Sequence, residues 1–206
     1  MNNKVILFLN GEVPTNIPNL ADYDKIFCTD GSYIYLKKLG IEPDFLTGDF
    51  DSLNQIEIAP EIQVINTPDQ NFTDFEKSLQ LITDKGYKNV DVYGASGKEQ
   101  DHFLGNLNAA LKFKELLNIK FFDNYSTYYF LNKKNRIDNV QDKIISLYPF
   151  PIATEIETKG LLYSLNKEEL SITDRIGTRN KAILNEIEIN FKNGNLIIFI
   201  NKKGLF

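Results

Sequence analysis

The stretch Phe45-Leu46-Thr47-Gly48-Asp49-Phe50-Asp51-Ser52 decides the fold, because a short apolar strand runs directly into an acidic loop. Side chains of an extended segment repeat with period two, so the carboxylates of Asp49 and Asp51 point the same way. Asp74, at a helix start, would add a third carboxylate, and Lys77 follows it by one turn. All-oxygen sites suit Mg²⁺, which keeps water or substrate phosphate in its remaining positions. The pattern therefore indicates metal-assisted phosphoryl chemistry, and the alternative is an Asx-rich turn that caps nearby backbone.

On both sides of this stretch, short apolar runs alternate with amphipathic ones. The predicted strands are 5–9, 25–28, 45–47, 63–66, 90–93 and 120–122, and the predicted helices are 32–39, 73–82 and 101–117. Gly40 follows the first helix as a C-terminal glycine does. Thr73 is the expected N-cap of the second helix, with Glu76 at the capping-box position. Strands that alternate with helices predict βαβ units and a mostly parallel, Rossmann-like sheet.

The last 65 or so residues have a different pattern. They hold short strand-like runs at 144–147, 154–157, 161–165, 186–191 and 196–201. Asn193-Gly194 separates the last two runs and predicts a hairpin there. We therefore expect an α/β domain at 1–125, a connecting segment at 126–142 and an antiparallel, β-sandwich-like domain at 143–206.

Bulk composition limits the possible functions. The chain has 206 residues and a net charge of −5, and it has no Lys/Arg stripe that would neutralise a nucleic acid backbone. Cys28 is the single cysteine, which favours a reducing cytoplasm. The apolar run Val5 to Leu9 is too short for a membrane span or a signal sequence. We expect a cytoplasmic protein that binds neither nucleic acid nor membrane.

Polar clusters follow almost every predicted strand of the first domain. They are Asn10-Gly11, Asp30-Gly31, Asp49 with Asp51, Asp69-Gln70 and the segment from Gly94 to Asp101. In open α/β sheets, ligands bind outside the carboxyl ends of the strands. These clusters therefore predict one site along one edge of the sheet.

Each candidate also has a structural interpretation. Thr73 and Asp74 could serve only as a helix cap and a favourable charge at the helix start, and Lys77 could be a solvated lysine. The glycines between Gly94 and Gly97 are common in loops between a strand and a helix. His102, the only histidine, more often has a structural role in such a position, and the chain offers no zinc-type ligand set.

Together these motifs resemble the thiamine pyrophosphokinase family, colinearly through almost the whole chain. Gly48 to Ser52 matches the family's G-D-F-D-S, and Leu39 to Asp44 is similar to its L-G-I-x-P-D. Further similar blocks are Thr29 to Ser32, Thr67 to Gln70, Thr73 to Lys77, Gly94 to His102, Lys159 to Leu165 and Gly177 to Asn180.

The resemblance implies transfer of diphosphate from ATP to the hydroxyl of thiamine, with AMP released, by a Mg²⁺-dependent homodimer. It implies a metal site made by Asp49, Asp51 and Asp74, which with Asp101 form the catalytic group. The implied nucleotide and phosphate contacts are Asn10, Asp30, Gly31, Gln70, Thr73, Lys77, Gly97 and Lys98. Gln70, Asp101, Thr178 and Asn180 would contact substrate, with thiamine between subunits near the turn from Gly177 to Asn180. The all-β domain would bind thiamine and form the dimer.

Three departures from the family pattern keep alternatives open, and one of them is Ser32, which stands where the family has a second glycine. The family's G-G-R is Gly97-Lys98-Glu99 in this chain, and a lysine does not make the bidentate fork of an arginine. Arg179 stands where the family has a serine. The alternatives are a pyrophosphokinase for another hydroxymethyl acceptor, such as a pterin, and a non-catalytic regulator that binds nucleotide or thiamine phosphates.

Overall fold

The structure is a computed structural model that describes residues 3–50 and 57–202. It divides into two compact units, residues 1–124 and 125–206. Asp51, one of the three expected metal ligands, lies outside the described residues. Each unit is described separately below.

The first unit contains a parallel sheet with the strand order β4-β3-β2-β1-β5-β6. Its strands are β1 (Lys4–Phe8), β2 (Lys25–Thr29), β3 (Phe45–Gly48), β4 (Gln63–Asn66), β5 (Asn89–Tyr93) and β6 (Asn118–Phe122). Its helices are the 3-10 turn η1 (Leu20–Asp22), α1 (Asp30–Lys38), α2 (Asp74–Asp84) and α3 (Gln100–Phe113). The predicted alternation of strands and helices is confirmed, element by element.

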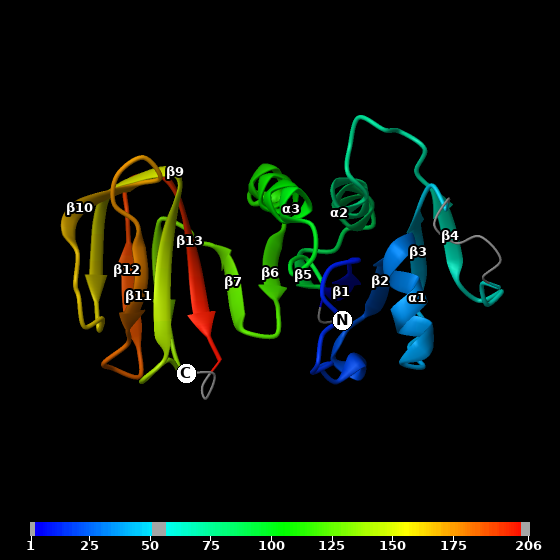
Figure 1. Ribbon diagram of the computed structural model, residues 1–206, viewed down its shortest axis with the longest axis horizontal. Coiled ribbons are helices and arrows are strands. Elements are labelled where there is room, and N and C mark those ends of the chain that lie inside the picture. Colours follow the sequence, from blue (N-terminus) through cyan, green and yellow to red (C-terminus); the bar gives the residue numbers. More distant parts are fainter. Residues whose placement is uncertain (1–2, 51–56, 203–206) are drawn as a thin grey trace. The chain divides into compact units, whose positions relative to one another are not determined.

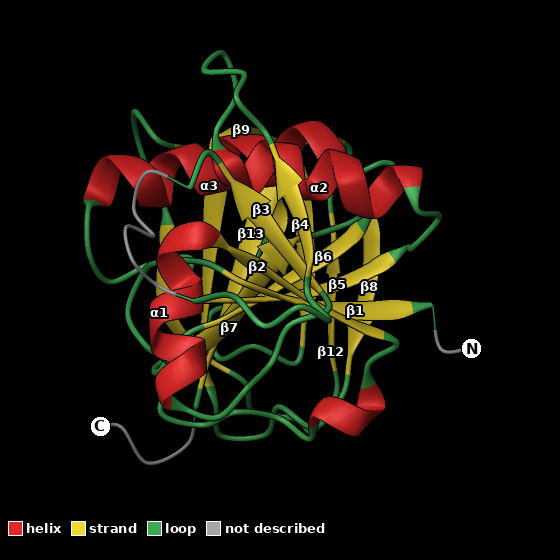
Figure 2. Cartoon of the chain, turned by 90° about the vertical axis from the view of Figure 1, so that its right-hand side faces the viewer, coloured by secondary structure: helices red, strands yellow, loops and turns green. Residues whose placement is uncertain are grey.

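Helices cover both faces of this sheet. Figure 2 shows α2 and α3 together along one side of the strands and α1 on the other. Ile6 and Phe8 of β1 pack with Leu36 of α1 in one core, whereas Phe75 of α2 meets the ring of Phe121 on the opposite face. Alternate residues of each central strand are therefore buried on opposite sides, which explains why the strands read as continuous apolar runs.

The second unit is antiparallel throughout its described residues (Figure 1). Its strands are β7 (Ser126–Phe130), β8 (Lys134–Ile137), β9 (Ile144–Lys159), β10 (Asn166–Ser171), β11 (Gly177–Lys181), β12 (Ile187–Asn190) and β13 (Asn193–Asn201). No helix lies within residues 125–202. A mixed architecture, parallel α/β followed by antiparallel β, is thus confirmed. Residues 126–142, expected to connect the domains, contain β7 and β8.

The predicted hairpin at Asn193-Gly194 is wrong. Both β12 and β13 pair with β9 and run in the same direction along it, with Asn190 opposite Glu157 and Asn193 opposite Thr154. The strand register shifts just after Gly194, whose φ is +78°. A Cβ at this position would collide with the Ile152 carbonyl oxygen. The Asn-Gly pair therefore marks a bulge where the chain runs on along β9, and it is not a turn at which the chain reverses direction.

Other strand predictions in this unit also need correction. The runs 144–147 and 154–157 belong to the single strand β9. Its Pro151 falls where the register of the partner β13 shifts, whereas its Pro149 lies opposite Leu196. The run 161–165 is no strand: Leu161 makes one isolated bridge, to Ala182. β10 and β11 were not predicted, since their mostly exposed, polar residues lack the alternation of a half-buried strand.

Candidate active site

The acidic loop after β3 folds onto the start of α1. Asp30 is only 7% exposed, and its carboxylate accepts from the backbone N–H of Gly31 at 2.6 Å and of Phe50 at 3.3 Å. Gly48 has a φ of +153°, and a Cβ there would lie 2.6 Å from Asp30 Cγ. Glycine is therefore required for the loop to approach this carboxylate so closely. Asp30 and the acidic loop are therefore in direct contact.

Asn10, just after β1, joins the loops that follow β2 and β5. A Cβ on Gly31 would lie 2.5 Å from Asn10 Nδ2, so the two residues are in contact. Lys98 Nζ donates to Asn10 Oδ1 at 3.0 Å. Gly97 has a φ of +89° and packs against Glu12. Loops that are far apart in the sequence thus meet at the carboxyl edge of the sheet, as the strand pattern predicts.

The segment after β4 joins the same edge. Gln70 Nε2 donates to Asp49 Oδ2 at 3.2 Å. Thr67 N–H donates to the Gly48 carbonyl at 2.9 Å. Thr67 Oγ1 is buried and has no hydrogen-bond partner in the described part of the chain. A buried hydroxyl without a partner is costly, which makes Thr67 a candidate ligand contact beside the acidic loop.

The first turn of α2 completes this edge. Thr73 Oγ1 accepts from the Glu76 N–H at 3.2 Å, so the predicted N-cap is confirmed. The Glu76 carboxylate accepts from Lys112 of α3 at 3.0 and 3.1 Å, in place of the reciprocal capping-box bond. Lys77, with a side chain only 10% exposed, contacts Asp74 Oδ1 at 3.0 Å and donates to the Thr67 carbonyl at 2.7 Å. Lys77 is therefore not a solvated surface lysine.

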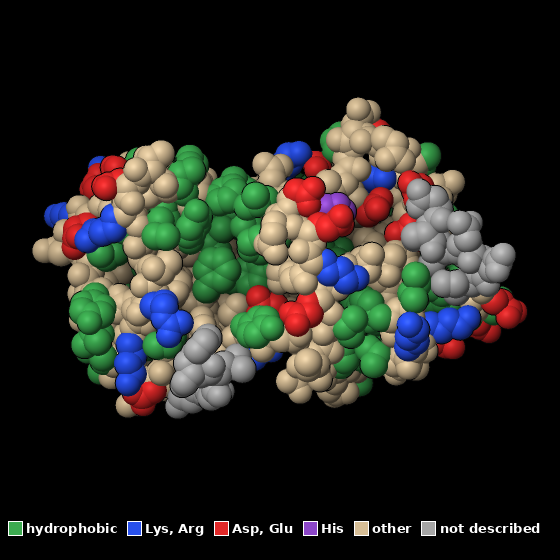
Figure 3. Space-filling view, in the orientation of Figure 1, with side chains coloured by type: hydrophobic (Ala, Val, Ile, Leu, Met, Phe, Trp, Pro, Cys, Tyr) green, Lys and Arg blue, Asp and Glu red, His purple; other side chains and the backbone are tan. Residues whose placement is uncertain are grey.

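The structure thus connects most of the sequence-predicted site residues of the first unit through direct contacts. Figure 3 shows acidic side chains gathered over α2 and α3, with basic side chains beside them. Asp101 makes a local contact, accepting from the His102 N–H at 2.9 Å in the first turn of α3. His102 is exposed and lies 3.7 Å from Glu99. Both of these contacts are with residues of the same helix start, and neither links His102 to the acidic loop.

Thr178 and Asn180 belong to the second unit. The expected turn from Gly177 to Asn180 is strand β11, with a bulge where Arg179 has a φ of +56°. Asn180 donates to the Tyr163 carbonyl at 2.7 Å and accepts from the Tyr163 N–H at 3.0 Å. This pair of bonds fixes the backbone of Tyr163, whose ring is exposed. Thr178 is exposed on the same strand.

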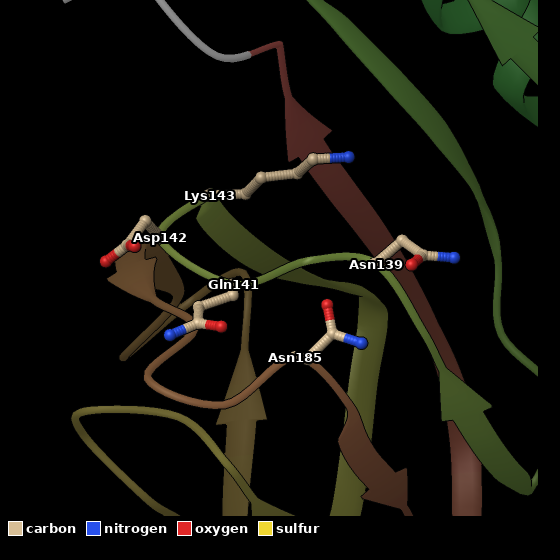
Figure 4. A pocket seen from close by; sticks show the side chains of 5 residues that line it. All are labelled: Asn139, Gln141, Asp142, Lys143 and Asn185. Atoms are coloured by element: carbon tan, nitrogen blue, oxygen red, sulfur yellow. The ribbon is translucent and has the colours of Figure 1, made fainter.

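A separate cavity of about 520 Å³ opens in the second unit (Figure 4). Its lining is polar and consists of Asn139, Gln141, Asp142, Lys143 and Asn185. Asp142 also pairs with Lys181 at 2.9 Å. The residues predicted to bind substrate do not line this cavity.

The acidic loop fits a hard divalent cation in its chemistry. Asp49 and Asp74 supply carboxylate oxygens, and proteins usually bind Mg²⁺ through one or two carboxylates plus substrate phosphate. Residues 3–50 and 57–202 contain no group of three His, Cys, Asp or Glu side chains that could hold a metal by itself. Asp49 and Asp74 are donors of the type that such a cation prefers.

Cys28 is not a nucleophile in this site. It is fully buried on β2, and burial raises the pKa of its thiol far above the usual range. The thiol is therefore protonated at neutral pH, and the reactive form of a cysteine is the thiolate.

Two residues of the site were missed in the sequence. Glu12 donates its N–H to the Ser96 carbonyl at 2.7 Å and packs on Gly97. Thr67 links the acidic loop to Lys77. Thr67 is the first residue of the family-like block Thr67 to Gln70, so this motif could have indicated it. No motif or spacing in the sequence indicates Glu12.

Comparisons with known proteins agree with this arrangement. Residues 19–121 match the thiamin pyrophosphokinase catalytic domain, and residues 134–196 match the thiamin pyrophosphokinase vitamin B1 binding domain. No helix in the described part of the chain is long and apolar enough to cross a bilayer.

Individual relatives give the same assignment. Thiamin pyrophosphokinase 1 of Caenorhabditis elegans is 33% identical over 123 residues, which cover 53% of this chain and half of that protein. Thiamine pyrophosphokinase of Bacillus subtilis is 26% identical over 95% of this chain and 97% of its own length. A crystal structure of thiamine pyrophosphokinase from Bacillus subtilis superposes with a TM-score of 0.83, at 25% identity over 97% of this chain and 99% of that one. The chain belongs to the thiamin pyrophosphokinase family of enzymes.

Proposed function

We propose that this chain transfers diphosphate from ATP to the hydroxyl of thiamine, giving thiamine diphosphate and AMP. The observation that carries the proposal is the contact chain at the carboxyl edge of the parallel sheet, from Lys98 and Asn10 through Asp30 and the acidic loop to Gln70. Phosphoryl-type transfer requires mainly positioning and charge neutralisation. An edge that combines carboxylates, lysines and a helix start provides both.

The residues of this edge have distinct proposed roles. Asp49, Asp51 and Asp74 would hold Mg²⁺, which when bound neutralises phosphate charge. Lys77 uses two of its three N–H donors on Asp74 and Thr67, so the third can reach a phosphate oxygen. The N-terminus of α2 favours negative charge at the same place. The proposed further nucleotide contacts are Asn10, Asp30, Gly31, Gln70, Thr73, Gly97 and Lys98.

Asp101 would orient the substrate or the nucleotide from the first turn of α3. Its carboxylate oxygen Oδ1 accepts a bond from within its own helix, which holds the side chain at the helix start. The second carboxylate oxygen has room for a ligand donor under this proposal, because an ionised carboxylate accepts several bonds.

The vitamin would bind through the second unit. Asn180 fixes the backbone of Tyr163, and the exposed Tyr163 ring suits a flat, cationic ligand. Thr178 would contact thiamine from the same strand as Asn180. Arg179 is exposed on this strand too, and its charge opposes that of thiamine, so the variant Arg179→Ser should lower the KM for thiamine.

A homodimer that shares the thiamine site is part of the proposal. The second unit exposes several large apolar side chains, which Figure 3 shows on its surface. They include Leu162, Tyr163, Ile172, Ile183 and Leu184. Apolar side chains that gather on an exposed surface can mark an interface. Light scattering of the purified chain tests it, and a strictly monomeric mass at assay concentration would contradict it. We also propose a cytoplasmic location.

A coupled assay for AMP release tests the activity. AMP that forms from ATP and Mg²⁺ only when thiamine is present supports the proposal. AMP that forms instead with a pterin alcohol would transfer the chemistry to another acceptor. Nucleotide binding without turnover on either acceptor would identify a regulator. Asp49→Asn is the matched negative control, because it keeps the shape of the side chain and removes its charge.

A further inference from the structure

Two buried hydroxyl groups connect β3 with α2. Thr47, the penultimate residue of β3, and Ser78, in the second turn of α2, are both 0% exposed. Thr47 Oγ1 and Ser78 Oγ are 2.7 Å apart. Ser78 Oγ also donates to the Asp74 carbonyl at 2.7 Å. A hydrogen-bonded path therefore runs from the strand that carries the acidic loop to the backbone of Asp74.

The distances favour one arrangement of the hydrogens in this path. Each hydroxyl has one hydrogen to donate. The contact from Ser78 Oγ to the Asp74 carbonyl is 2.7 Å, whereas that from Thr47 Oγ1 to the Cys28 carbonyl is 3.3 Å, which favours Ser78 as the donor to Asp74 and Thr47 as the donor to Ser78 Oγ. The Cys28 carbonyl, 3.3 Å from Thr47 Oγ1, is then the weaker contact. Every step points the same way, from the strand to the first turn of the helix.

The two ends of this hydrogen-bonded path lie next to two residues of the proposed metal site. Thr47 is two residues before Asp49, and the bond from Ser78 ends on Asp74 itself. Helix α2 is also held near the sheet by apolar contacts such as that between Phe75 and Phe121, and by the bond from Lys77 to the Thr67 carbonyl just after β4. Such packing is non-directional and tolerates sliding along the helix axis, whereas a hydrogen bond fixes direction and distance. The hydroxyl pair thus sets where the first turn of α2 stands relative to the end of β3.

We propose that Thr47 and Ser78 are positioning residues that set the spacing between the acidic loop and the start of α2, and thereby the affinity for a divalent cation and for its ATP complex. This inference rests on the proposed function, because it assumes that Asp49 and Asp74 serve one site. Neither Thr47 nor Ser78 touches the ligands in this role. They act through the backbone of the residues that do.

The test separates the hydroxyl of Thr47 from its shape. Thr47→Val keeps the shape and removes the hydroxyl, whereas Thr47→Ser keeps the hydroxyl and removes a methyl group. Ser78→Ala removes the other partner. Thr83→Val is the matched control, because Thr83 Oγ1 makes the same kind of bond, to the Leu79 carbonyl at 2.8 Å, at the far end of α2. Binding of Mn²⁺, measured by electron paramagnetic resonance without thiamine, is the first readout.

We expect Thr47→Val and Ser78→Ala each to weaken Mn²⁺ binding about tenfold, the effect typical of residues that orient metal ligands. The KM for ATP should rise in both variants. The double variant should bind Mn²⁺ only slightly more weakly than either single variant, since both changes break the same hydrogen-bonded path. Thr47→Ser and Thr83→Val should bind Mn²⁺ as the unchanged protein does. Equal affinity in Thr47→Val, or an equal loss in Thr47→Ser, would overturn the inference.

Other outcomes keep the two proposals apart. If Thr47→Val does not fold, Ser78→Ala decides the question alone. If the unchanged protein binds Mn²⁺ but forms no AMP with thiamine, the acceptor assignment is wrong while the positioning role is still decided by the binding data. If the unchanged protein binds no Mn²⁺ with or without ATP, the metal assignment and this inference are both wrong.

Discussion

Replacement of Lys77 by methionine should reduce both stability and turnover, and the structure separates the two effects. The Lys77 ammonium donates to the Thr67 carbonyl at 2.7 Å and pairs with Asp74 at 3.0 Å. Its side chain is 10% exposed, whereas that of Asp74 is 40% exposed. Methionine keeps most of the apolar stem, so the change removes mainly the charge and its bonds.

The magnitude follows from these contacts. A charged donor on a carbonyl contributes about 1.5–3 kcal/mol, and a pair with a partly exposed carboxylate adds less than about 1 kcal/mol. We expect a loss of about 2–3 kcal/mol in the free energy of unfolding, which lowers the melting temperature by roughly 5–10 °C in a chain of this size. A typical domain has about 5–15 kcal/mol in total, so the variant should still fold at 25 °C.

Turnover should fall further than stability alone explains. If the third N–H of Lys77 stabilises a phosphate oxygen in the transition state, its loss should reduce kcat by about 10²–10³-fold. Lys112→Met is the matched control. Lys112 also pairs with a carboxylate of α2, that of Glu76, but its side chain is 51% exposed. Loss of this ion pair should lower the free energy of unfolding by less than about 1 kcal/mol and leave kcat nearly unchanged.

The measurements are urea unfolding and AMP release at saturating ATP and thiamine, both at 25 °C. A Lys77→Met variant with reduced stability and normal kcat would refute the phosphate role and leave only a structural one. Unchanged stability would refute the buried contacts themselves. Lys77→Arg should recover most of the stability and only part of the turnover, because a planar guanidinium does not reproduce an ammonium.

Three further predictions follow from other parts of the chain. Asp74→Asn should reduce turnover by about 10²-fold and raise the Mg²⁺ concentration for half-maximal activity, as measured by a Mg²⁺ titration after EDTA treatment. Gly194→Val should cost at least about 1–3 kcal/mol in urea unfolding, because it imposes a φ of +78° on a branched residue, and wild-type stability would contradict the bulge. Burial raises the pKa of Tyr23 and of Cys28 above their ordinary values of 10.0 and 9.0. This stabilisation is complete below those ordinary values and is lost as the pH rises past them, so the free energy of unfolding should fall above about pH 9, less steeply in Tyr23→Phe.

Local sequence patterns predicted the first unit well because its signals are local. Gly40 ends α1 with a φ of +69°, and Thr73 caps α2 through its side chain. Both depend on the few residues that surround them. The gathering of polar loops at one edge also followed from local information, since parallel strands put their carboxyl ends on the same side.

The second unit was harder because its strands depend on distant partners. The Asn193-Gly194 pair is compatible with a hairpin and with a bulge, and only the pairing of both flanking strands with β9 decides between them. β11 is mostly polar and has a residue with positive φ in its middle, so nothing in its own sequence marks a strand. What makes it one is the edge of β9 that it pairs with.

The same distinction explains why motifs locate this site but not the residues that shape it. A motif marks a side chain by its chemistry and by its neighbours in the chain, which suffices for Asp49 or Lys77. Thr47 and Ser78 are 31 residues apart, and each looks like an ordinary small polar residue in its own element. Their contact exists only because the buried face of α2 lies on β3 at one particular height. Sequence reasoning from a single chain can therefore name the groups that touch a phosphate, whereas the groups that set the distances between them need the packed structure.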